Sequence, residues 1–86
     1  MNRPKSQPDE RVKDVRFTSA RLIVDLADGR TISVPLAWFP GLSAATRAQC
    51  ANWKVSAGGH GIHWPGIDED LSTEGLLRGA PARRRA

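Results

Sequence analysis

A single cysteine, Cys50, stands among the 86 residues, which excludes an internal disulfide framework and is typical of a protein from a reducing compartment. No stretch approaches the roughly 20 consecutive apolar residues that a membrane-spanning helix needs. The opening residues, MNRPKSQPDE, are polar and lack the apolar segment of a secretory signal. These absences predict a cytoplasmic protein that does not bind membranes.

The middle of the chain also lacks an excess of positive charge, although the formal net charge is +4. Residues 11–79 carry eight basic and seven acidic side chains and are therefore almost neutral. We predict that residues 11–79 form one domain, between a disordered tail at 1–10 and a flexible basic tail at 80–86. The C-terminal tail contains Arg83, Arg84 and Arg85. The near-neutral charge of the domain argues against a basic nucleic-acid-binding fold.

Motifs that carry catalysis are absent as well. There is no Gly-x-Ser-x-Gly elbow, and the glycine-rich stretch Ala57–Gly61 lacks the helix and lysine that follow a phosphate-binding loop. Cys50 could act as a nucleophile beside His60 or His63, but its alanine-rich surroundings favour packing as a small apolar residue. We therefore expect no catalytic residues and no cofactor.

Two histidines precede an acidic triplet, and both residue types bind divalent metals. Their spacing matches none of the strong zinc patterns. We expect His60 to be solvated in its glycine-rich turn and His63 to lie on the exposed face of a strand. The carboxylates of Asp68, Glu69 and Asp70 are expected to favour the N-terminus of a following helix. The sequence thus predicts no metal site.

The most informative stretch is RLIVDLADGRTISVPLAWFP. Apolar and polar residues alternate on both sides of an Asp-Gly pair, which indicates a β-hairpin with one face on a core. A two-residue loop would place Ile32 opposite Asp25 and so put the apolar faces on different sides. A three-residue loop pairs Val24 with Ile32 instead and gives Gly29 the left-handed position of the turn. We therefore predict the three-residue loop.

The remaining pattern predicts an α+β fold, in which an antiparallel β-meander packs with two short helices in a single small domain. Further strands are expected at Val12–Thr18, Trp53–Ser56 and Ile62–Trp64, and helices at Ala44–Ala51 and Thr73–Arg78. Ser43 and Ser72 are suited to cap these helices, and Gly79 to end the second. Pro40 and Gly41 are expected to keep the LAWFPGL stretch irregular.

The segments LADGRTISVPL, WFPGL and GIHWPGIDEDLSTEGLL, in this order, resemble the bacterial family of domain of unknown function 2442. The resemblance covers about Val12 to Leu77. It implies a small α+β domain in which a meander packs with short helices. It also implies a neighbouring gene for another small protein, in an arrangement like a toxin–antitoxin pair. No catalytic residues are established for the family, and Gly41 stands where a basic residue is expected.

These observations predict a non-enzymatic, antitoxin-like module that binds and restrains a small partner protein. A free strand edge could pair with the partner, or the sheet face bearing Ile23 and Asp25 could cover it. Trp38 is the aromatic residue expected to be part exposed, because it lies in a loop. With His63, these residues form the predicted partner-binding set. The core of so small a domain gives it little stability to spare, so a homodimer, which would bury more apolar surface, is a further candidate assembly.

Two other functions stay open. A nucleic-acid-associated regulator would grip the phosphate backbone with Arg83–Arg85 while the domain dimerises. Less favoured is a small metal-dependent enzyme that uses His60, His63 and Asp68.

Overall fold

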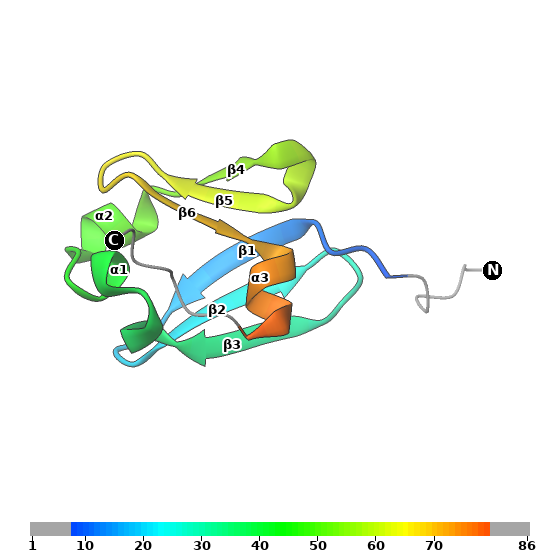
Figure 1. Ribbon diagram of the computed structural model, residues 1–86, viewed down its shortest axis with the longest axis horizontal. Coiled ribbons are helices and arrows are strands. Elements are labelled where there is room, and N and C mark those ends of the chain that lie inside the picture. The colour runs from blue at the N-terminus through cyan, green and yellow to red at the C-terminus, as the bar shows by residue number, and fades with distance from the viewer. Residues whose placement is uncertain (1–7, 80–86) are drawn as a thin grey trace.

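The computed structural model describes residues 8–79, so the tail segments 1–7 and 80–86 lie outside the described residues. Strands dominate the first half of the chain, and short helices and strands alternate in the second (Figure 1). In chain order, the elements are β1 (Val12–Phe17), β2 (Arg21–Leu26), β3 (Thr31–Pro35), the 3-10 turn η1 (Leu36–Trp38), α1 (Pro40–Ser43), α2 (Arg47–Ala51), β4 (Lys54–Ser56), the 3-10 turn η2 (Ala57–Gly59), β5 (Gly61–Trp64), β6 (Glu69–Ser72) and α3 (Thr73–Arg78).

The strands form two three-stranded antiparallel sheets, with the orders β1-β2-β3 and β4-β5-β6. The predicted α+β class is therefore confirmed. The second sheet contains a strand that was not predicted, because β6 uses the acidic segment that was expected only to precede a helix. Asp70 of β6 pairs with His63 of β5, and Leu71 pairs with Ile62.

The hairpin of β2 and β3 has the predicted register. Val24 pairs with Ile32, and Leu22 pairs with Val34. The amide of Leu26 donates to the carbonyl of Arg30 at 2.8 Å. Gly29 has a φ of 100°, the left-handed conformation that the three-residue loop requires. The requirement that the apolar residues of both strands share one face therefore predicted the correct turn.

The Asp28 side chain has a structural function that was not predicted. Its carboxylate accepts hydrogen bonds from the backbone amides of Asp9 and Arg30, at 2.9 and 3.0 Å, and from the Arg30 guanidinium. Its side chain is only 5% exposed. The Arg30 side chain and the two amides hold the pKa of Asp28 well below its usual range. Asp28 thereby fastens the segment before β1 to the hairpin turn.

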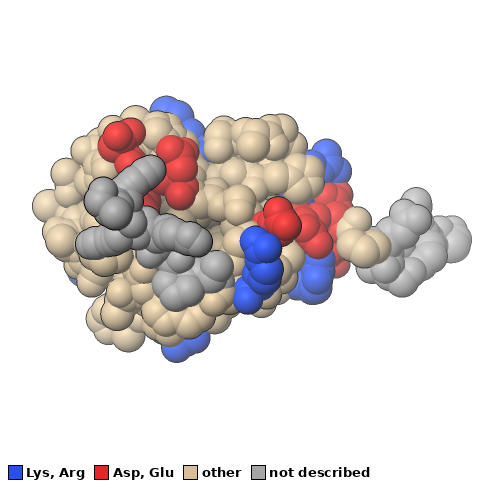
Figure 2. Space-filling model, viewed as in Figure 1, with Lys and Arg blue, Asp and Glu red and all other residues tan. Residues whose placement is uncertain are grey.

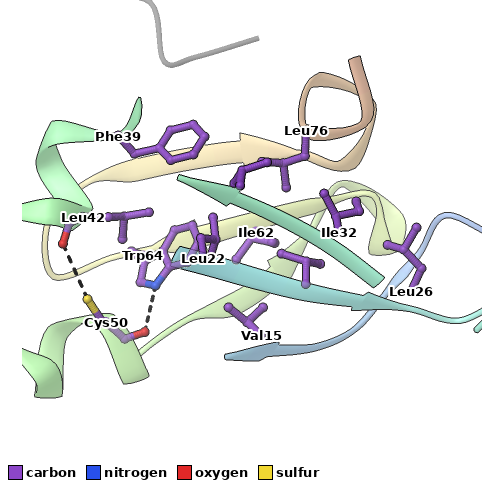
Figure 3. Close-up of a cluster of buried hydrophobic side chains, with 12 residues drawn as sticks. Val15, Leu22, Leu26, Ile32, Phe39, Leu42, Cys50, Ile62, Trp64 and Leu76 are labelled. Atoms are coloured by element: carbon purple, nitrogen blue, oxygen red, sulfur yellow. Dashed lines mark hydrogen bonds between the residues drawn. The ribbon is translucent and has the colours of Figure 1, made fainter. Parts of the chain in front are cut away.

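The core lies between the two sheets (Figure 3). Sheet β1-β2-β3 contributes alternate residues from its inner face, and β5 contributes Ile62 and Trp64, which are fully buried. The indole N–H of Trp64 donates to the carbonyl of Cys50 at 3.0 Å (Figure 3). This hydrogen bond attaches the end of α2 to the second sheet. The buried apolar residues are Val15, Leu22, Val24, Leu26, Ile32, Val34, Phe39, Leu42, Cys50, Ile62, Trp64 and Leu76.

The helix predicted at Ala44–Ala51 was wrong in its boundaries. Helix α1 begins at Pro40, which is tolerated at a first helical position because its missing N–H would have no partner there. Ser43, predicted as an N-cap, ends α1. Thr46 caps α2 through a reciprocal capping box with Gln49.

The C-terminal helix is confirmed. The hydroxyl of Ser72 accepts from the amide of Gly75 at 3.0 Å, and Gly79 ends the helix with a φ of 79°. Helix α3 contacts β3 and covers the core on that side of the two sheets (Figure 1). No helix among residues 8–79 is long and apolar enough to span a membrane.

Candidate functional site

The predicted sheet face around Ile23 and Asp25 is polar and internally paired. The Arg16 guanidinium binds the Asp25 carboxylate at 3.0 and 3.1 Å, and the Thr31 hydroxyl donates to the same carboxylate at 2.8 Å. These hydrogen bonds, Arg16 first, lower the pKa of Asp25. Ile23 is half-buried, opposite Arg16 on one side and Ser33 on the other. This face offers little apolar surface to a partner.

The other two predicted partner-binding residues lie elsewhere. Trp38 is half-buried and packs edge-to-face on Phe39, with ring centroids 6.4 Å apart. His63 points away from the core on β5, and its Nδ1 lies 2.9 Å from Oδ1 of Asp70. Because Ile23 and His63 lie on the outer faces of opposing sheets, the structure does not bring the predicted set together. Arg83, Arg84 and Arg85 lie outside the described residues.

The histidines and carboxylates do not form a metal centre among residues 8–79, where no three such side chains converge. His60 is exposed, as expected, and its carbonyl accepts from the amide of Thr73 at 3.0 Å. Figure 2 shows acidic side chains gathered over the β5–β6 turn and the start of β6, the segment that contains Asp68, Glu69 and Asp70. Burial, and then the Asp70 and Asp68 charges, raise the pKa of Glu69.

A groove of about 540 Å³ lies at the end of the molecule where the β1–β2 turn faces α1 and α2 (Figure 1). Phe17, Leu36, Leu42 and Ala45 supply its apolar lining. Its polar lining consists of Thr18, Ser19, Ser43 and Arg47. Three segments that are separate in the sequence, residues 17–19, Leu36 and residues 42–50, therefore form one concave surface. Sequence patterning gave no signal for it, because no single segment contains more than part of the lining.

Cys50 also lines this groove, but it is 8% exposed. Burial raises the pKa of its thiol, which keeps the sulfur protonated. The Sγ atom lies 3.7 Å from the carbonyl oxygen of Leu42. A protonated, buried thiol in this position is a packing group, in agreement with the interpretation of Cys50 as a small apolar residue.

Arg47 differs from the other arginines within residues 8–79. Arg11, Arg16, Arg30 and Arg78 pair with carboxylates, and Arg21 binds the hydroxyl and carbonyl of Ser33. Arg47 has no such side-chain partner in this part of the chain. The groove therefore carries a positive charge that nearby described residues leave unneutralised.

Two large apolar side chains are exposed outside the groove: Val55 of β4, at 49%, and Leu77 of α3, at 39%. Val55 pairs with the fully buried Ile62 and so lies on the core-facing side of the sheet. It remains exposed because β4 is an edge strand, and no other described strand lies beyond it.

Comparisons with known proteins agree on the fold. A family model described as "Protein of unknown function (DUF2442)" matches residues 12–82. The crystal structure of a protein of unknown function from Rhodospirillum rubrum has a TM-score of 0.75 and 34% identity, covering 90% of this chain and 95% of that chain. The solution NMR structure of an uncharacterised protein from Chromobacterium violaceum has a TM-score of 0.72 and 24% identity, covering 85% of this chain and 69% of that chain. This second similarity supports the fold only. No curated protein matches the chain.

Proposed function

This chain belongs to the DUF2442 family of proteins of unknown function, and we propose that it is a non-catalytic, antitoxin-like interaction module that binds a small partner protein. The gene arrangement implied by the family resemblance supports a protein partner. The polar chemistry of the domain is compatible with this function, because most of its charged side chains bind one another rather than converge on a site.

The observation that carries the proposal is the exposed apolar edge at β4. This strand pairs only with β5, so its other edge has unpaired backbone groups among the described residues, and Val55 adds apolar surface there. A partner strand added beside β4 would satisfy the backbone groups and cover Val55. The mechanism is surface masking by strand addition.

The two edges of the first sheet are less suited to this role. Strand β1 has a register shift at Lys13 and exposed charges along its length, which are features that blunt a sheet edge. Strand β3 ends at Pro35, which has no N–H to donate, and α3 contacts this strand. This comparison favours β4 over β1 and β3 as the docking edge.

Co-purification with the protein encoded by the neighbouring gene tests the proposal. We expect a stoichiometric complex that survives removal of residues 80–86, and we expect Val55→Lys to abolish it. Leu77→Lys is the matched control, because it places the same charge at the other exposed apolar position. Failure of the two proteins to associate overturns the proposed function. Loss of the complex with Leu77→Lys but not with Val55→Lys moves the interface from β4 to α3.

The nucleic-acid alternative makes the opposite prediction. Binding that depends on Arg83–Arg85 should disappear when the tail is removed and should weaken steeply as salt is added. Electrophoretic mobility shifts with and without residues 80–86, at two salt concentrations, separate it from protein binding.

A further inference from the structure

The end groove combines an apolar lining with one cation, Arg47, that has no side-chain partner among residues 8–79. Phe17 of β1, Leu36 of η1 and Ala45 are half-buried and give the groove its apolar surface, whereas Leu42 of α1 is almost fully buried beneath it. Its volume of about 540 Å³ lies within the range of roughly 300–1,000 Å³ that is usual for ligand sites. An apolar group that entered the groove would bury surface against these side chains.

The positive charge of Arg47 at the groove favours an occupant that carries an acidic group. Every other described arginine has a side-chain partner within the domain, whereas Arg47 has none there. A guanidinium presents a planar fork of N–H donors that matches a carboxylate. The hydroxyls of Ser19 and Ser43, which also line the groove, are further donors for an acidic group.

The shape of the groove favours a segment of a larger molecule. It is open to solvent, whereas sites for free small molecules bury most of the ligand. A short stretch of a partner chain can place one apolar side chain in an open groove while its backbone stays outside. Charge complementarity with Arg47 then requires an acidic residue next to that side chain.

We propose that this groove is the receptor for a segment of the partner protein in which an aliphatic side chain is followed by a carboxylate. The apolar side chain lies against Phe17, Leu36 and Ala45, and the carboxylate binds Arg47. This proposal rests on the proposed function, because it takes the occupant to be a protein. It adds to the β4 edge a second contact that selects the partner by charge.

Capped tripeptides and a ¹⁵N-labelled full-length chain test the groove directly. The probes are acetyl-Leu-Leu-Asp-amide and acetyl-Leu-Leu-Asn-amide, which differ only in the charge of the last side chain. We expect both peptides to shift amide resonances of residues 17–19 and 42–50, and we expect the Asp peptide to bind about fivefold tighter, the upper range for an exposed ion pair.

Variants assign the effect to its residues. Arg47→Gln should remove the preference for the Asp peptide, while Arg78→Gln, an exposed arginine on α3, should preserve it. Ala45→Leu should fill the groove and weaken both peptides. A native-like spectrum of each variant shows that the fold is intact. Absence of shifts at the groove, or a preference that survives in Arg47→Gln, overturns the proposal.

Two further outcomes separate this inference from the proposed function. Equal or larger shifts with hexanoate at the same concentration mean that the groove takes a small acid, which overturns the assignment to a protein segment. A neighbour-protein complex that forms with undiminished affinity in Arg47→Gln overturns the groove as a contact while leaving the interaction function intact. Groove binding of the Asp peptide without any neighbour-protein complex supports the groove as a binding site and overturns the proposed interaction with the neighbouring protein.

Discussion

Replacement of Trp64 by phenylalanine tests how α2 is held against the second sheet. The Trp64 side chain is fully buried, and its indole N–H donates to the carbonyl of Cys50 at 3.0 Å. This carbonyl belongs to the last turn of α2, where helix carbonyls lack intrahelical donors. Phenylalanine keeps an aromatic ring but removes the donor, so the carbonyl stays buried without a partner.

The expected cost has two parts. A buried carbonyl that loses its donor costs about 1–3 kcal/mol. The smaller ring leaves a cavity and reduces apolar burial, which adds roughly 1–2 kcal/mol. A domain of this size has a total stability of roughly 4–11 kcal/mol. Trp64→Phe should therefore remove about 2–5 kcal/mol, a large part of the total stability.

Urea unfolding of Trp64→Phe beside Trp38→Phe provides the assay. Trp38 is half-buried, and its replacement should cost less than about 1 kcal/mol. Hydrogen exchange of the indole N–H groups gives a second readout, in which Trp64 should exchange more slowly than Trp38. Equal costs for the two variants, or equally fast exchange of both indoles, would refute the role assigned to this hydrogen bond.

Three other substitutions test local interactions. The Arg11 side chain lowers the pKa of Asp9 from 3.8 to about 2. The ionised Asp9 carboxylate therefore stabilises the fold above pH 4, and this stabilisation is lost as the pH falls toward 2. Acid titration of Asp9→Asn should show a smaller loss of stability between pH 4 and pH 2. Burial raises the pKa of Glu69, so ionisation opposes folding above its ordinary pKa of 4.5. Glu69→Gln should therefore raise the melting temperature at pH 7 and have no such effect at pH 3. Gly29→Val should cost about 1–2 kcal/mol in urea because of its φ of 100°, although no atom lies within 4 Å of the added Cβ; an unchanged midpoint would contradict the strain.

The features of the fold that sequence predicted well are local. The register of the hairpin follows from the parity of its apolar residues and from a turn that requires Gly29 at positive φ. The cap of α3 at Ser72 and its end at Gly79 depend on hydrogen bonds within one helix. Such interactions involve residues a few positions apart, so the printed sequence contains both partners.

The candidate site was much less accessible to sequence reasoning. The predicted partner-binding residues are dispersed over separate surfaces, because facial exposure was inferred strand by strand without knowledge of how the sheets stack. Val55 has the pattern of an inward residue, and only its place on an edge strand exposes it. Arg47 is one arginine among several in the sequence, and its lack of a side-chain partner within residues 8–79 can be recognised only once the other arginines are placed.

The sequence by itself determined the α+β class, the β2–β3 hairpin with its three-residue loop and the capped helix α3, because each depends on alternation, capping or turn geometry within a short segment. The tertiary structure decided that the acidic segment forms β6, since that strand exists through its pairing with β5. It also decided that Asp28 fastens the segment before β1 and that three separate segments line the groove beside Arg47. These features are contacts between distant residues, and their energies depend on positions that only the folded chain defines.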